Sequence, residues 1–169
     1  MLFRSVNRGI KQMLAQTDRE PRQMPDASES DDGLDAAFFW FDNATRQLTF
    51  AGAKSSLFVL QPGEAEGAMI NGARMGVGYV DTAMDYVWDN NTVQTQVGTL
   101  VFVTTDGLID QIGGPREIAF GKRRMREAIC AQREASAAEI SDAVLDVHRT
   151  WQGEQRRRDD LTFFCFRAQ

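Results

Sequence analysis

Two aspartates at the ends of apolar segments are the residues best suited to carry chemistry. The segment Leu100–Asp110 opens with β-branched and aromatic residues, typical of a buried strand, and this run stops at Asp106. Gly107 follows it, and glycine permits a sharp turn or a close approach to a ligand. Asp159 stands shortly before a second apolar segment, 163–166. Carboxylates at strand ends suit hard cations such as Mg²⁺, Mn²⁺ or Ca²⁺, although simple turns would use the same residues.

The composition is that of an ordinary globular domain. The 169 residues are 43% hydrophobic and 25% charged, enough for one domain with a core. A net charge of −5 argues against nucleic-acid binding, which needs a basic face. The single histidine, His148, excludes His-rich zinc sites and most catalytic triads, and we expect it to be a packing or surface residue. Cys130 and Cys165 are expected to be reduced thiols.

The N-terminal segment, residues 1–17, predicts an amphipathic helix over 2–16. Its apolar residues follow helical spacing, and Arg4, Arg8 and Lys11 lie on the other side. A basic amphipathic helix could bind a membrane surface or a partner, but this apolar stripe is a normal core stripe, so we expect it to pack on its own domain. No apolar run of about 18 residues and no signal peptide are present, which predicts no direct membrane span and a cytoplasmic chain.

The rest of the chain divides into four regions. Residues 18–35 form an acidic loop with prolines and serines, and residues 36–110 are rich in expected strands. We expect a hairpin of 36–41 with 47–51, a strand at 57–60, a glycine-rich stretch over 63–80, and a second hairpin of 86–89 with 92–97. Because Ala36–Phe41 is continuously apolar, we expect that strand to be central or buried on both sides.

Helices are expected over 115–155, followed by a final strand over 160–167. The first helix spans about 122–133. The second begins at a capping box of Ser136 and Glu139, in which each side chain can accept a hydrogen bond from the backbone amide of the other residue. This helix is expected to end at Gly153.

Five short motifs occur along residues 1–169 in an order that resembles one family. They are Ala51-Gly52, Met75-Gly76-Val77, Thr105-Asp106-Gly107, Phe120-Gly121-Lys122-Arg123 and Asp159-Asp160-Leu161-Thr162. Together they resemble the SpoIIE-type phosphatases, the bacterial branch of the PP2C metal-dependent Ser/Thr phosphatases. The resemblance is greatest to the SiaA-like members, which are membrane-linked regulators of biofilm signalling.

The resemblance implies an α+β fold, a PP2C-like β-sandwich flanked by helices. It implies Mn²⁺ or Mg²⁺ between the sheets and a metal-activated water that hydrolyses phosphoserine or phosphothreonine. The substrate would be a phosphorylated regulatory protein, such as an anti-sigma-factor antagonist, and the natural full-length protein would be membrane-anchored. By the match, Asp106 and Asp159 are the catalytic metal ligands, and Asp110 is a weaker candidate for a looser ion. Gly107 and Asp160 would support these ligands.

Three arginines directly precede the second acidic pair. Arg156, Arg157 and Arg158 could hold a phosphoprotein substrate, because guanidinium groups match phosphate bidentately. The alternative is a solvated loop whose positive charge offsets neighbouring acids.

The chain also departs from the family pattern. The upstream Asp-Gly metal motif and the Gly-His-Gly turn are missing, and the pair at 32–33 is out of order and reads as a turn. Ala53 replaces the family's histidine, and Thr99 replaces its usual acid. We therefore expect an incomplete domain that lacks N-terminal strands. Two other functions stay open: a catalytically incomplete module for protein interaction or homodimer formation, and an anion- or nucleotide-binding domain built on 63–80.

Overall fold

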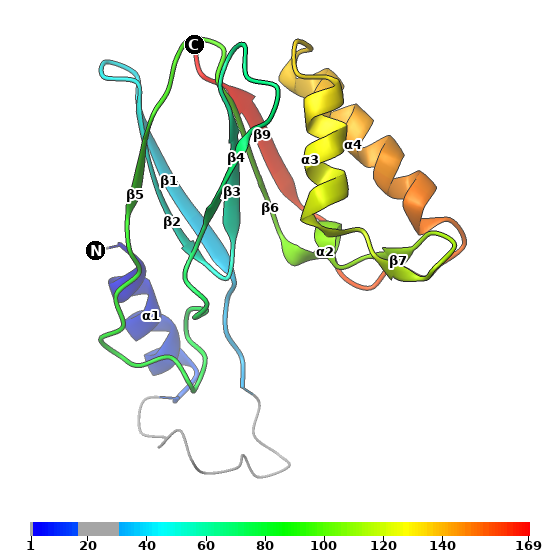
Figure 1. Cartoon of the computed structure of the whole chain (residues 1–169). Coiled ribbons are helices and arrows are strands. Elements are labelled where there is room, and N and C mark those ends of the chain that lie inside the picture. The colour runs from blue at the N-terminus through cyan, green and yellow to red at the C-terminus, as the bar shows by residue number, and fades with distance from the viewer. Residues whose placement is uncertain (1, 17–30) are drawn as a thin grey trace.

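A computed structural model describes residues 2–16 and 31–169 of the chain (Figure 1). Most of the loop expected over 18–35 lies outside the described residues. One sheet contains β1 (Ala36–Asp42), β2 (Gln47–Ala53) and β5 (Asn91–Gln94), in the order β1-β2-β5. The other contains β3 (Ser56–Leu60), β4 (Ala68–Asn71), β6 (Leu100–Thr104) and β9 (Phe163–Arg167), in the order β4-β3-β6-β9, and all neighbours in both sheets are antiparallel.

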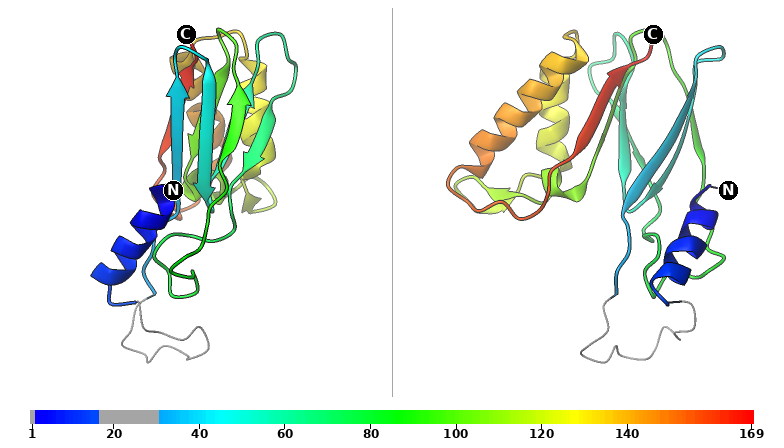
Figure 2. Two further views of the ribbon diagram at one scale, coloured as in Figure 1. Left: turned by 90° about the vertical axis from the view of Figure 1, so that its left-hand side faces the viewer. Right: turned by 180° about the vertical axis from the view of Figure 1, so that it is seen from behind.

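The helices flank these two sheets. The elements outside the sheets are α1 (Leu2–Met13), α2 (Asp106–Ile109), α3 (Gly121–Ala131), α4 (Ala137–Gln152) and a small hairpin of β7 (Ile112–Gly113) with β8 (Ile118–Ala119). Figures 1 and 2 show α3 and α4 on the side of the four-stranded sheet and α1 on the opposite side, at the lower end of the molecule. The prediction of an α+β sandwich flanked by helices is therefore confirmed.

Alternation along β3 builds two cores. Leu57 and Val59 point toward the other sheet and pack with Leu48, Phe50 and Val101, which are 0% exposed. The intervening residues of β3 face the helices, in a cluster of Phe58, Leu60, Leu100, Phe102, Leu108, Phe120, Met125, Ala128, Ile129, Ile140 and Val144. The four-stranded sheet is therefore covered on both faces, which fixes the end of β6 firmly in space.

The capping box at the start of α4 is confirmed. The Ser136 amide donates to Glu139 Oε2 at 2.8 Å, and the Glu139 amide donates to Ser136 Oγ at 3.3 Å. Gly153 ends the helix with a φ of 54°, in the left-handed region that glycine adopts without strain.

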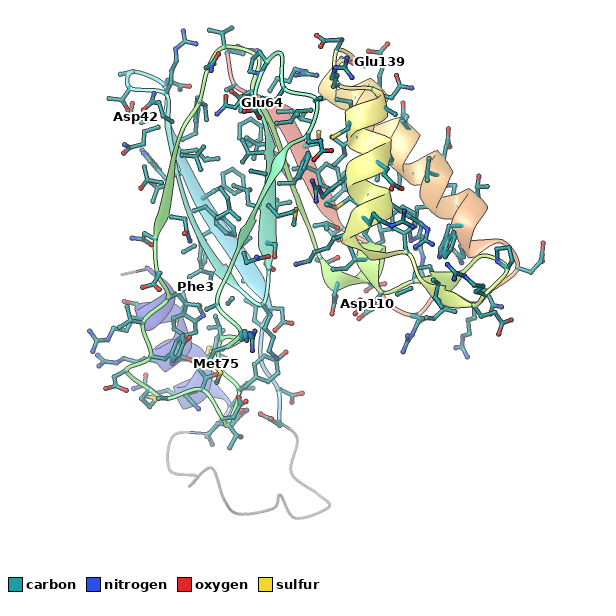
Figure 3. The ribbon with its side chains drawn as sticks, viewed as in Figure 1. Phe3, Asp42, Glu64, Met75, Asp110 and Glu139 are labelled. Atoms are coloured by element: carbon teal, nitrogen blue, oxygen red, sulfur yellow. The ribbon has the colours of Figure 1, made fainter. Side chains whose placement is uncertain are left out.

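The helix α1 packs on its own domain, as expected. Phe3, labelled in Figure 3, is 3% exposed. Its ring centroid lies 4.5 Å from that of Phe38 and 5.4 Å from that of Trp88. The buried Asn7 adds two hydrogen bonds: its Nδ2 donates to the Ala83 carbonyl, and its Oδ1 accepts from the Gly78 amide, each at 2.9 Å. None of the helices in residues 2–16 and 31–169 combines the length and apolar character of a membrane span.

Three strand predictions need correction. Residues 86–89 form no strand, because the Trp88 indole donates to the Met75 carbonyl at 2.9 Å and the ring packs against Phe3 instead. The strand β5 pairs with β2, and β4 occupies part of the glycine-rich stretch. The strand β1 is an edge strand rather than a central one: Phe39 faces the second sheet, whereas Trp40 is 73% exposed on the outer face.

Candidate active site

The pairing of β6 with β9 brings the two acidic segments together. Thr104 lies opposite Phe163 in this antiparallel ladder, so the residues after β6 and before β9 must run side by side. The ladder continues one step into the loops: the Thr105 amide donates to the Thr162 carbonyl at 2.9 Å, and the Thr162 amide donates to Thr105 Oγ1 at 3.1 Å. Two segments far apart in sequence therefore meet at one end of the sandwich.

Gly107 is the closest point of this meeting. A Cβ added to Gly107 would lie 2.1 Å from the Asp160 carbonyl oxygen and 3.4 Å from the Asp159 carbonyl carbon. No side chain fits such a gap, so only glycine lets α2 approach the loop before β9. The Thr105 hydroxyl, 3.3 Å from the Asp160 carbonyl oxygen, donates to the same group. The structure thus places Asp106 beside the loop that carries Asp159 and Asp160.

The carboxylates of this site face solvent. Asp106, Asp110, Asp159 and Asp160 are all exposed. Asp159 Oδ1 accepts from the Asp160 amide at 2.7 Å, which fixes one of its oxygens within the loop. The Asp110 amide donates to the Asp106 carbonyl at 2.8 Å, so Asp110 ends α2, one turn after Asp106 (Figure 3). Exposure keeps these groups hydrated and accessible to an ion.

The donor set fits a magnesium- or manganese-type ion in part. Within residues 2–16 and 31–169, no group of three or more His, Cys, Asp or Glu side chains could hold a metal ion. Asp106 and Asp159 supply hard carboxylate oxygens, and Mg²⁺ is commonly held through one or two carboxylates while it keeps several waters. The pair therefore suits a loosely held, hydrated ion rather than an enclosed one.

Two adjoining cavities next to Asp106 contain residues that the sequence reasoning missed. The smaller one, of about 70 Å³, is lined by Lys54, Ser56, Asp106 and Lys122 together with Thr104 and apolar side chains. The wider one, of about 520 Å³, shares Lys54, Ser56 and Lys122 and adds Arg74. Lys122 lies in the Phe-Gly-Lys-Arg motif, but nothing in the sequence joins it to Lys54.

Tyr79 and Asp35 also lie at this end of the molecule. The Lys54 ammonium is 4.0 Å from the centre of the Tyr79 ring and 3.6 Å from Asp35 Oδ1. Burial raises the pKa of Tyr79, and the negative charges of Asp35, Asp31 and Asp106 raise it further. The phenol therefore stays neutral at physiological pH.

The arginine loop is held by a buried glutamine. Gln111 is 1% exposed; its Nε2 donates to the Arg156 carbonyl at 3.1 Å, and its Oε1 accepts from the Arg158 amide at 3.3 Å. The side chains of Arg156, Arg157 and Arg158 are exposed, and no salt bridge between described residues includes them. Gln111 is a positioning residue that sequence reasoning missed, because its partners lie far along the chain.

His148 is a packing residue, one of the two roles expected of it. It is 1% exposed, and its ring meets Phe120 edge-on with centroids 5.3 Å apart. Burial lowers the pKa of His148, and the positive charges of Arg157 and Arg149 lower it further. The imidazole is therefore neutral and stays inside the domain.

A two-sheet sandwich flanked by helices is the fold that this chain shares with PP2C-type phosphatase domains. The chain belongs to the SpoIIE family, since the family model for stage II sporulation protein E (SpoIIE) matches residues 3–169. A comparison with curated proteins gave no match.

Solved structures agree with this assignment. The PP2C domain of SiaA from Pseudomonas aeruginosa is 30% identical with a TM-score of 0.73, and the match covers 98% of this chain and 69% of that domain. The phosphatase domain of SpoIIE from Bacillus subtilis is 12% identical with a TM-score of 0.61, covering 99% and 71%. RsbX in complex with magnesium is 18% identical with a TM-score of 0.52, covering 79% and 55%. The chain thus corresponds to about two thirds of the SiaA and SpoIIE domains, as expected for an incomplete domain.

Proposed function

We propose that this chain carries part of the active site of a Mn²⁺- or Mg²⁺-dependent protein serine/threonine phosphatase. Its substrate is a phosphorylated regulatory protein of the anti-sigma-antagonist kind. The contact of Gly107 with the Asp160 carbonyl, where an added Cβ would lie 2.1 Å from the oxygen, is the observation that carries the proposal. This contact holds the loop that carries Asp159 and Asp160 against the start of α2, next to Asp106.

In this proposal Asp106 and Asp159 hold the ion, and Asp110 offers a weaker contact one turn further on. Gly107 and Asp160 keep the two loops in register. When bound, the ion supplies positive charge to the phosphate and lowers the pKa of a coordinated water. Phosphate-monoester hydrolysis is among the slowest uncatalysed reactions, so fixed charges at this end of the sandwich are the contribution that matters most.

The test is hydrolysis of a phosphoserine peptide with and without Mn²⁺. We expect Mn²⁺-dependent release of phosphate that Asp106→Asn and Asp159→Asn both abolish. Asp146→Asn is the matched control, because Asp146 is an exposed aspartate on α4 that pairs with Arg149, away from the candidate site. Wild-type activity no higher than that of the Asp106→Asn, Asp159→Asn double variant would refute catalysis by this chain.

A non-catalytic role in homodimer formation is the second candidate. The outer face of the three-stranded sheet has an apolar cavity of about 410 Å³ that Phe38, Trp40 and Val87 help to line. Trp40 is 73% and Val87 64% exposed, and β1 is an edge strand, which invites pairing with a second copy. Light scattering after size exclusion would then show a dimer that Trp40→Glu dissociates. A monomer at all concentrations would exclude this role.

A further inference from the structure

A pair of lysines faces the space beside Asp106. The charged residues that line the smaller cavity are two lysines, Lys54 and Lys122, and one aspartate, Asp106. The adjoining wider cavity shares both lysines, adds Arg74, and has no carboxylate in its lining. Lys54 also lies 3.6 Å from Asp35 Oδ1, so Lys122 and Arg74 supply the positive charge here that no carboxylate of the described residues pairs, in a chain whose net charge is −5. Such a spot suits a small anion that enters from the wide side and stops next to Asp106.

Lys54 occupies a backbone conformation that favours glycine. Its φ is 54°, in the left-handed region, at the crossing from β2 in one sheet to β3 in the other. The Lys54 amide donates to the Ala73 carbonyl at 2.8 Å, which holds the conformation in place. A non-glycine residue here costs free energy, and strain of this kind concentrates at functional sites. A function of the ammonium group would explain why lysine, rather than glycine, occupies this position.

Lys122 lies in the N-terminal turn of α3, where a positive charge does not stabilise a helix. The first turn of α3 contains Lys122, Arg123 and Arg124, and it has neither an acidic residue nor a side-chain cap. The helix dipole favours negative charge at this end, so these cations do not stabilise the helix. Arg123 pairs with Glu127 at 3.0 Å, and Arg124 lies 3.5 Å above the Trp151 ring. Within the described residues Lys122 has no carboxylate partner; it donates to Ser56 Oγ at 2.9 Å.

We propose that Lys54 and Lys122 bind the phosphoryl oxygens of a substrate phosphoserine or phosphothreonine. This inference rests on the proposed phosphatase function and assigns its phosphate-binding residues. An ammonium group has three N–H donors, and Lys122 uses one of them on Ser56, which leaves two for the ligand. A phosphorylated side chain carries a charge of about −1.5 to −2 at pH 7 and three acceptor oxygens, which matches two neighbouring ammonium groups. Arg74 at the wide cavity attracts the same anion.

The test is equilibrium binding of a fluorescent phosphoserine peptide in EDTA, where hydrolysis does not interfere. Lys54→Gly relieves the backbone strain and removes the ammonium group, and Lys122→Met keeps the apolar stem. We expect each to weaken binding about tenfold, the loss of one charge-assisted hydrogen bond. Inorganic phosphate should compete with the peptide for the wild-type chain. Lys54→Met, checked by circular dichroism, replaces Lys54→Gly if the latter fails to fold.

Two control variants match these changes in kind but lie elsewhere. Arg46→Gly also replaces a cation at a positive φ, of 56°, in the β1–β2 turn, and Arg123→Met removes the neighbouring cation of α3. We expect both to bind within about twofold of wild type, since neither lines the cavities. The inference is wrong if the controls weaken binding as much as the lysine variants do. It is also wrong if the phosphorylated peptide binds no better than its unphosphorylated form.

Hydrolysis measured on the same variants separates this inference from the function. If Asp106→Asn abolishes Mn²⁺-dependent hydrolysis while both lysine variants bind like wild type, the lysine assignment fails and the phosphatase stands. If binding depends on the lysines but Mn²⁺ gives no hydrolysis, the phosphate site stands and the phosphatase fails.

Discussion

Replacing Gly107 by alanine tests the contact on which the site depends. The φ of Gly107 is not positive, so alanine suits its backbone, and helix propensity alone would favour alanine by about 1 kcal/mol. The added Cβ would nevertheless lie 2.1 Å from the Asp160 carbonyl oxygen and 2.8 Å from its carbon. These are backbone atoms of a loop tied to β6 by the Thr105–Thr162 hydrogen bonds, so they cannot move aside as a flexible side chain would.

The cost follows from that geometry. Overpacking by one methyl group typically destabilises a protein by about 1–3 kcal/mol, which exceeds the gain in helix propensity. The loop can avoid the clash only by moving outward by an ångström or more, and it carries Asp159 with it. A misplacement of about 1 Å can cost about 100-fold in rate when the displaced group holds the reacting parts. We therefore expect lower stability, weaker Mn²⁺ binding and a much larger loss of hydrolysis.

Urea denaturation, Mn²⁺ titration and phosphopeptide hydrolysis measure the three effects. The matched control is Gly9→Ala, since Gly9 lies in α1 and a Cβ there would meet no atom within 4 Å. That control should be as stable as wild type or more stable by up to about 1 kcal/mol, with unchanged Mn²⁺ binding. A Gly107→Ala protein with wild-type stability and Mn²⁺ affinity would show that the two acidic loops do not depend on this contact.

Three further predictions concern the scaffold. The pKa of His148 is lowered in the folded state, so the unfolded chain takes up the proton first as the pH falls, and the free energy of unfolding should decrease below about pH 6.5. Urea denaturation of His148→Leu at a series of pH values should show a smaller dependence of the free energy of unfolding on pH. Ser136→Ala removes the cap of α4 and should cost about 1 kcal/mol in thermal unfolding, whereas Ala138→Ser beside it should change little. Phe3→Ala should cost about 3–5 kcal/mol and increase amide exchange in α1; unchanged exchange would contradict the packing described here.

The sequence predicted the parts of the fold that local patterns determine. The capping box of α4 needs only Ser136 and Glu139, and the buried strand β6 needs only its own β-branched residues. The approach of the loop after β6 to the loop before β9 follows from the β6–β9 ladder, whereas the roles of Asp106 and Asp159 came from the family resemblance and stay a prediction. In each of these cases the determining residues lie close together in the chain or follow a known motif order.

Other parts depend on contacts between distant residues. Trp88 lies in a segment that reads as a strand, but its indole is held by the Met75 carbonyl, and no local pattern indicates that partner. The apolar run of β1 suggests burial on both faces, whereas it lies at an edge, where Trp40 faces outward. Lys54 and Lys122 come together only because β2 crosses to β3 beside the start of α3. Tertiary contacts therefore decide these positions, and single-sequence patterns do not contain them.

By the family resemblance, Ala53 and Thr99 stand where related phosphatases carry a histidine and an acid, which would leave the proposed ion fewer ligands. Ala53 is 0% exposed, and Thr99 is 0% exposed with its hydroxyl donating to Gln61 Oε1 at 2.5 Å, so both positions now serve packing and internal hydrogen bonds. Ala53 has no side-chain donor atom, and the buried Thr99 hydroxyl is already engaged in hydrogen bonds with Gln61 and Gln96. In the proposed function, an ion held by Asp106 and Asp159 would then keep more of its water, which would weaken its binding and leave more of the phosphate charge to the protein. The proposed lysine pair beside the carboxylates would supply this positive charge. Removing one lysine should therefore reduce phosphopeptide binding more here than at a site with more metal ligands.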